Sequence, residues 1–134
     1  MGAWGSGIFE NDAACDFAAS VAESDDLKAL ERALDRVLAA EAEYLEASEA
    51  EEGLAAAEIV ARLNGSPGTR TSHTASIDTW VERLRLAPSE ELVDKARRSI
   101  IRILSEPSEI LELWQESKDF EAWKRAVAEV SQRL

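Results

Sequence analysis

The chain has 134 residues, of which 46% are hydrophobic and 31% are charged, and its formal net charge is −12. This length and composition favour a single soluble globular domain over residues 1–134 and argue against a disordered chain. Because phosphate-backbone binding depends on Lys and Arg, the negative charge argues against nucleic acid and anionic membranes as partners and favours a basic protein.

The first twelve residues, MGAWGSGIFEND, differ from the rest because they contain three of the six glycines together with Trp4 and Phe9. We interpret this segment as structured: Trp4, Ile8 and Phe9 pack on the core or in a groove, and the glycines allow the bends. Gly2 also begins a short N-myristoylation pattern, and a Gly-rich loop before a helix can bind phosphate. We favour neither interpretation, because myristoylation requires a eukaryotic transferase and the nearby carboxylates would repel a phosphate.

Apolar residues recur at helical spacing along the rest of the chain, and no segment shows the sustained alternation of a strand. Capping and turn residues divide this pattern into six or seven helices. The predicted helices begin at Asn11 or Asp12, after 24–26, at Ser48, near Ile77, at 88–90, at Pro107 and at Phe120. The fold class is therefore predicted to be all-α, a compact single-domain helical bundle with the Gly/aromatic N-terminal segment packed on it.

The third predicted helix, which reaches about residue 63, is apolar nearly all round. This pattern predicts a central, buried helix. Ser48 and Glu51 match a capping box at its start. Gly53 and the alanines that follow would let neighbouring helices approach closely.

The opening pattern Met-Gly-x-Trp-Gly-x-Gly-x-Phe-[Asp/Glu]-Asn-Asp, with Phe17 shortly after it, resembles the signature of an uncharacterised bacterial family, a domain of unknown function. The resemblance continues in the stretch LAAAE at 54–58 and spans most of the chain. Glu10 and Phe17 stand where Asp and Trp are more common in the family. The resemblance implies a small helical cytoplasmic protein and carries over no catalytic residue. It suggests that Trp4, Asn11, Asp12 and Asp16 belong to a shared framework or site of the family. We take these four residues and Phe9 as the candidate binding residues.

Glu10, Asp12 and Asp16 are also candidate ligands of a divalent cation, because hard cations prefer several oxygen ligands and the two aspartates share a helix face. The same carboxylates stabilise a helix N-terminus, and we predict no resident metal or cofactor. A single histidine, His73, and a single cysteine, Cys15, exclude a Cys/His zinc site and an intrachain disulfide. Thr71, Ser72 and Cys15 could serve as nucleophiles for His73, but no nucleophile-elbow or protease motif surrounds them. The acidic neighbours of Cys15 disfavour a reactive thiolate.

Lys95, Arg98 and Arg102 form a basic stripe at helical spacing. This stripe could pair with the chain's own acidic segments, contact the acidic run 41–52 of another copy, or bind a ligand carboxylate, although an exposed helix face is the simplest interpretation. A second acidic group shares one side of a later helix, without the Glu-x-x-His motifs of a di-iron bundle. Its members are Glu106, Glu109, Glu112 and Glu116.

These observations favour a non-enzymatic interaction protein, immunity-like or regulatory, whose acidic surface binds a basic partner. The alternative is a small metal-dependent hydrolase or ligand-binding protein that uses the N-terminal carboxylates. A third option is self-association through the basic stripe and an acidic segment. We expect a cytoplasmic protein, because no apolar run approaches the ~18 residues of a membrane span and no basic signal region precedes the first helix.

Overall fold

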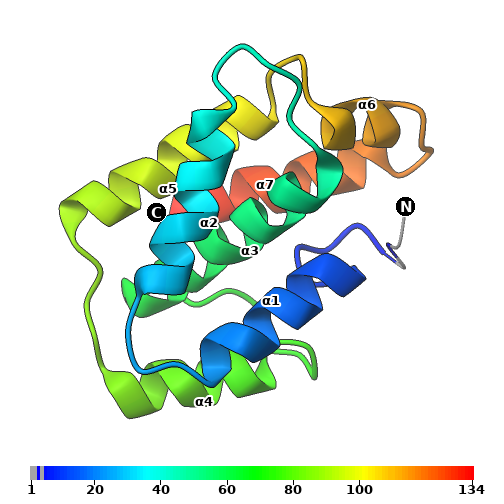
Figure 1. Ribbon diagram of the computed structural model, residues 1–134. Coiled ribbons are helices and arrows are strands. Elements are labelled where there is room, and N and C mark those ends of the chain that lie inside the picture. Colours follow the sequence, from blue (N-terminus) through cyan, green and yellow to red (C-terminus); the bar gives the residue numbers. More distant parts are fainter. Residues whose placement is uncertain (1–2, 4) are drawn as a thin grey trace.

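The computed structural model describes residues 3 and 5–134, and Figure 1 shows their arrangement. These residues form seven α-helices. They are α1 Asp12–Ala22, α2 Lys28–Ala39, α3 Ala47–Leu63, α4 Ala75–Leu84, α5 Glu90–Ile103, α6 Glu109–Gln115 and α7 Phe120–Arg133. Extended pairing within the described chain is limited to two isolated bridges, Ala3 with Asn11 and Leu45 with Ser108. The predicted all-α class is confirmed.

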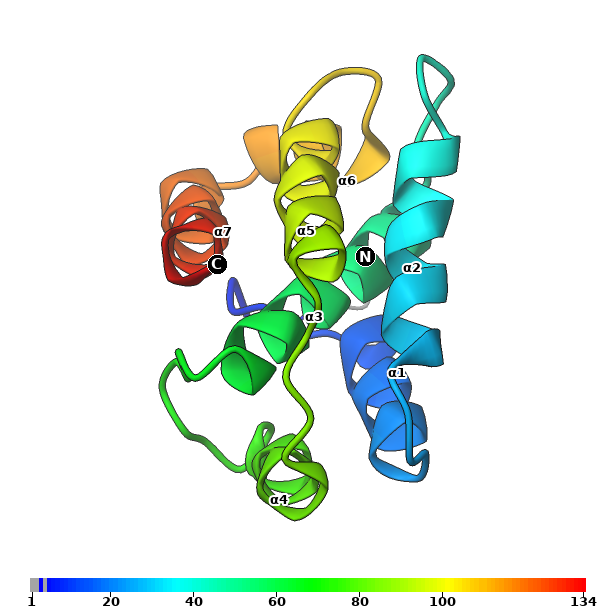
Figure 2. The ribbon, with the colours of Figure 1, turned by 90° about the vertical axis from the view of Figure 1, so that its left-hand side faces the viewer.

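Helix α3 lies at the centre of the bundle and contacts all six other helices. Figure 2 shows α3 in the middle, with α4 below it and α2 and α7 on opposite sides. An unbroken run of buried residues, 53–63, covers its whole circumference, as the apolar pattern predicted. A methyl group added to Gly53 would overlap the side chain of Val37, so this glycine allows α2 to pack closely against α3.

Two helix starts agree with the capping residues of the sequence. Asn11 caps α1, because its side-chain oxygen accepts a hydrogen bond from the Ala14 amide at 2.8 Å. Ser89 caps α5 by accepting from the Leu92 amide at 3.1 Å. None of the helices in the described ranges has the length and apolarity to cross a bilayer.

The predicted starts of α3 and α6 were wrong, because a contact between distant segments replaces the local cap. Helix α3 begins at Ala47 instead of after Ser48, and the Ala47 amide donates to the Glu109 carboxylate at 2.7 Å. Helix α6 begins at Glu109, beyond Pro107. The Leu45 amide donates to the Pro107 carbonyl at 3.2 Å, and the Glu109 amide donates to the Leu45 carbonyl at 2.9 Å, so this backbone pairing holds Pro107 outside the helix.

Candidate functional site

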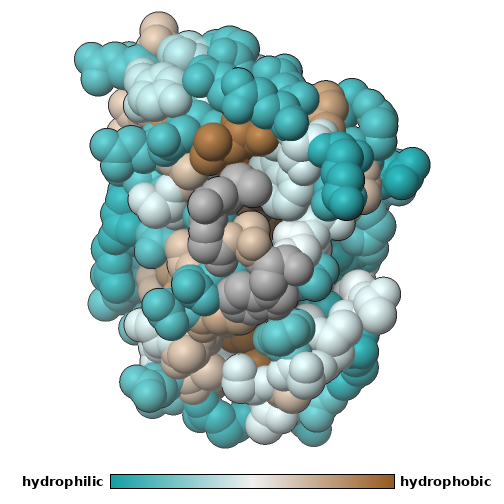
Figure 3. Space-filling view, turned by 90° about the vertical axis from the view of Figure 1, so that its right-hand side faces the viewer, coloured by the Kyte–Doolittle hydropathy of each residue, from teal (hydrophilic) through white to brown (hydrophobic). Residues whose placement is uncertain are grey.

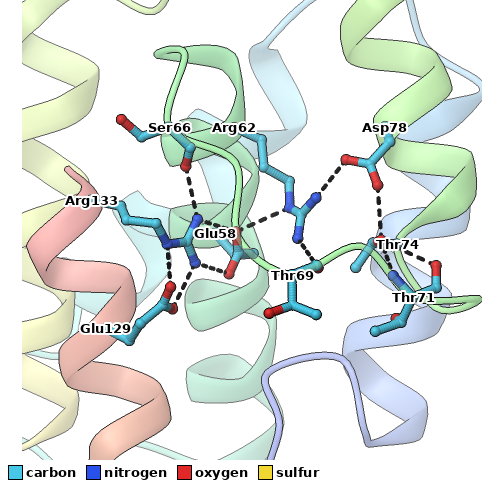
Figure 4. A network of polar contacts seen from close by, with 9 residues as sticks. All are labelled: Glu58, Arg62, Ser66, Thr69, Thr71, Thr74, Asp78, Glu129 and Arg133. Atoms are coloured by element: carbon cyan, nitrogen blue, oxygen red, sulfur yellow. Dashed lines mark hydrogen bonds and ion pairs between the residues drawn. The ribbon is translucent and has the colours of Figure 1, made fainter.

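A buried network of charged side chains lies where α3, α4 and α7 meet (Figure 4). Arg62 of α3 is at its centre, with only 3% of its side chain exposed. Its Nε donates to Glu58 at 3.0 Å, one turn earlier in the same helix, and its Nη1 donates to Asp78 of α4. Its Nη2 donates to the Thr69 carbonyl at 2.8 Å, which fixes the loop between α3 and α4.

Arg133 at the end of α7 binds the other side of Glu58. Its two terminal nitrogens each reach a different oxygen of the Glu58 carboxylate, one of them at 2.8 Å. The same guanidinium also bonds to Glu129 and to the Ser66 carbonyl, so α7 is fastened to α3 and to the following loop. The hydrogen bonds to Glu58 raise the pKa of Arg133 further above its ordinary value, and Arg133 therefore remains charged.

Asp78 is held in place by the start of α4. The Thr74 hydroxyl donates to Asp78 at 2.8 Å and accepts from the Thr71 amide at 2.9 Å. Both carboxylate oxygens of Asp78 therefore have a donor, one from Arg62 and one from Thr74. The buried side-chain polar atoms of the described residues are all hydrogen-bonded. Hydrogen bonds therefore compensate the buried charges of the network, as burial requires.

Sequence reasoning missed Arg62, Asp78 and Arg133. The signal that was present is the pair Glu58 and Arg62, spaced four residues apart inside an otherwise apolar helix. Two charges at that spacing on a buried helix require an internal partner. The sequence contains no comparable signal for Arg133, because its partner is 75 positions away.

A pocket of about 320 Å³ lies beside this network. One wall is the N-terminal segment 7–10, and Glu58 and Arg62 face it from α3. The loop before α4 and the last turns of α7 complete the lining with these residues: Thr69, Thr71, His73, Thr74, Ala126, Glu129 and Arg133. The structure therefore brings together the two stretches on which the family resemblance rests, the Gly-rich opening and the LAAAE helix.

The five candidate binding residues lie in different environments. Phe9 is buried in the core and lines the pocket, and Asn11 is buried as the cap of α1. Asp12 and Asp16 are exposed on α1. Trp4 lies outside the described residues. A binding role for these residues stays a prediction.

Glu10 is not gathered with Asp12 and Asp16 into an ion site. Its carboxylate turns back to accept a hydrogen bond from the Gly7 amide at 3.0 Å. Methyl groups on Gly5 or Gly7 would overlap that carboxylate, so both glycines allow the backbone to close around it. Among the described residues, no group of three His, Cys, Asp or Glu side chains is placed to hold a metal.

A family model described as a domain of unknown function (DUF4259) matches residues 2–126. The chain belongs to this family. The match includes the pocket wall at 7–10 and the buried residues Glu58, Arg62 and Asp78, whereas Arg133 lies beyond it. No curated protein and no solved structure gives a significant match.

In this family member, Cys15 and His73 have local roles. The Cys15 thiol donates to the Phe9 carbonyl at 3.0 Å. Burial raises the pKa of Cys15, and the nearby carboxylates of Asp12 and Asp16 raise it further, so the thiol stays protonated. His73 is exposed at the rim of the pocket, and its amide donates to the Thr71 hydroxyl.

The basic stripe is engaged with other parts of the same chain. Lys95 lies 3.2 Å from Glu31 and 3.0 Å from Asp35 of α2. Arg102 donates to the backbone carbonyls at 41 and 43, in the loop before α3. Arg98 pairs with its neighbour on α5, Asp94, at 2.7 Å. These contacts show pairing within the chain, and the other two options for the stripe stay predictions.

Proposed function

We propose that this protein is a non-enzymatic interaction protein of the cytoplasm, immunity-like or regulatory, and that one acidic end of the bundle binds a basic protein partner. The supporting observation is that two acidic segments, far apart in the sequence, lie side by side at the top of the molecule in Figure 1. We call this surface the acidic end. Its carboxylates are Glu41, Glu43, Glu46, Glu106 and Glu112.

Direct contacts hold the two segments together. The backbone pairing of Leu45 with residues 107–109 aligns them. The Tyr44 hydroxyl donates to the Glu112 carboxylate at 3.2 Å. Arg102 lies beneath, and its guanidinium binds the backbone carbonyls at 41, 43 and 107. The carboxylates are therefore presented on a fixed framework, which lowers the entropic cost of binding a partner.

The pKa values of two groups at the acidic end are raised. Desolvation raises the pKa of Glu106, and the neighbouring Glu112 raises it further by hydrogen bonding and repulsion. The pKa of Tyr44 is raised by the same two causes, desolvation first and Glu112 second. A cationic partner would relieve this repulsion and would associate faster at low salt.

The surface of the acidic end is also concave. A hollow of about 330 Å³ is lined there by Glu43, Tyr44, Glu46 and Glu49, with Arg36 on one side. Tyr44 is 51% exposed, and tyrosine is enriched in protein interfaces because it combines a large apolar ring with a hydroxyl. Figure 3 shows mostly hydrophilic side chains along the upper edge of the adjoining face.

The test uses two triple variants with the same net charge. The first neutralises the acidic end through Glu43→Gln, Glu106→Gln and Glu112→Gln. The second neutralises exposed carboxylates elsewhere through Glu23→Gln, Glu90→Gln and Glu121→Gln. Binding of a nine-residue lysine peptide is measured by calorimetry at low and high salt, and cross-linking in cell extract then identifies proteins that the wild type retains.

We expect the acidic-end variant to lose at least tenfold in peptide affinity and to lose its cross-linked partner, while the second variant keeps both. Added salt should weaken wild-type binding. If the two variants lose affinity equally, total charge accounts for the binding and the acidic end is not a specific surface.

A further inference from the structure

The pocket beside the buried network is the second concave site of interest, and it lies away from the acidic end. Its volume of about 320 Å³ is within the range of small-molecule sites. Ile8, Phe9 and Ala126 give it an apolar side, and charged and hydroxyl side chains give it a polar side. Four separate segments form its walls, so its shape depends on the whole fold.

The two arginines of the pocket are already occupied by protein groups. All five N–H donors of Arg133 have acceptors in Glu58, Glu129 and the Ser66 carbonyl. Arg62 donates three of its five N–H groups to Glu58, Asp78 and Thr69, and the two carboxylates neutralise its charge. A ligand carboxylate or phosphate would have to compete with these internal carboxylates. The pocket is therefore poorly suited to an anion.

Glu58 and Glu129 are each paired with an arginine, whereas Glu10 is the carboxylate of the lining that has no ion pair among the described residues. Among the described residues, its hydrogen bond comes from the Gly7 amide to Oε1, which leaves Oε2 without a donor. Gly5 and Gly7 lie against this carboxylate. The lining contains three carboxylates and two guanidinium groups, so it has one net negative charge with His73 counted as neutral.

We propose that this pocket binds a small organic cation, an alkylamine or an alkylguanidine, with its charged head on Glu10 and its alkyl chain against Ile8 and Phe9. An ammonium or guanidinium group supplies only donors, which matches the open acceptor. An aliphatic chain of a few carbons would bury apolar area against the opposite wall. The site does not depend on the acidic end or on its partner.

Calorimetry with putrescine and with agmatine tests the proposal, and glutarate serves as an anion of similar length. N-acetyl-arginine amide is the fourth probe, since it carries the same head on a peptide unit. We expect putrescine, agmatine or both to bind, and we expect glutarate not to bind. A comparison of agmatine with the capped arginine tells whether the pocket takes a free cation or a side chain. Absence of binding by all three cations would overturn the proposal.

Three variants identify the site. Glu10→Gln keeps an acceptor for the Gly7 amide but removes the charge, and it should weaken cation binding at least tenfold. Ala126→Phe fills the pocket without changing charge and should weaken binding to a similar extent. Glu121→Gln, on the same helix but outside the pocket, should bind within twofold of the wild type. Unchanged affinity in both Glu10→Gln and Ala126→Phe, with melting temperatures that confirm folding, would also overturn the proposal.

Discussion

Arg133 binds both oxygens of the Glu58 carboxylate across 75 positions of sequence. Arg62 binds the same carboxylate from within α3, so two guanidinium groups share one buried acceptor. Glu58 is consequently the point at which the last helix is joined to the central one. The pocket lies directly against this junction.

Arg133→Ala should destabilise the protein by about 2–4 kcal/mol, because it leaves the buried Glu58 with one cation instead of two. Urea unfolding at neutral pH measures the change. Arg98→Ala is the matched control, since Arg98 makes an exposed pair with Asp94 on α5. That control should cost no more than about 0.5 kcal/mol. Equal losses in the two variants would contradict a structural role for the junction.

The ion pair of Arg62 with Asp78 should show strong energetic coupling. In a double-mutant cycle with Arg62→Met and Asp78→Asn, we expect a coupling energy of about 2 kcal/mol or more, because both groups are buried and Arg62→Met leaves the Asp78 carboxylate without a cation. The exposed pair of Arg70 with Glu82 provides the comparison cycle. Its coupling should be about 0.3 kcal/mol. An equally small coupling energy for Arg62 and Asp78 would show that water screens this ion pair and would contradict its burial.

Glu51 should make the stability of the protein fall as pH rises from about 4.5 to 7. It is 8% exposed, and burial raises its pKa to about 7, with a further contribution from the carboxylates of Asp12 and Glu109. The folded state therefore binds more protons than the unfolded state in this window, and the free energy of unfolding decreases with pH. Glu51→Gln should match the wild type at pH 4 and exceed it by about 1–2 kcal/mol at pH 8. Urea unfolding at pH 4, 6 and 8 measures this, and a difference that stayed constant with pH would contradict the assignment.

The helices were predictable because their signals are local. Apolar spacing locates α3 and its burial, and the side chains of Asn11 and Ser89 cap helices within three residues of themselves. The capping box at Ser48 and Glu51 failed for the opposite reason. The Ala47 amide is satisfied by Glu109, 62 residues away, and Glu51 is buried. A local sequence motif carries no information about a hydrogen-bond acceptor that is so distant in the sequence.

The candidate site was predicted in part, for a related reason. The opening segment was identified from its unusual glycines, and Glu10 does line the pocket. The exposed positions of Asp12 and Asp16 follow from the outward face of α1, which depends on where α3 lies. The buried arginines were hidden because a charged residue on a helix is most often solvated. The tertiary packing of α4 and α7 adds the partners that the sequence does not indicate, Asp78 for Arg62 and Arg133 for Glu58.

Gly53→Ala should destabilise the protein although alanine favours a helix by about 1 kcal/mol. The added methyl group would overlap Val37 of α2, and such overpacking costs about 1–3 kcal/mol. Val37→Ala should relieve the overlap, so the double variant should lose at least about 1 kcal/mol less than the sum of the single losses. Ile103→Val is the control, because the Ile103 side chain would lie at an ordinary contact distance of 3.6 Å from the new methyl group. Its effect should add to that of Gly53→Ala. A rescue by Ile103→Val equal to that by Val37→Ala would show that the close approach at Gly53 is not specific to α2.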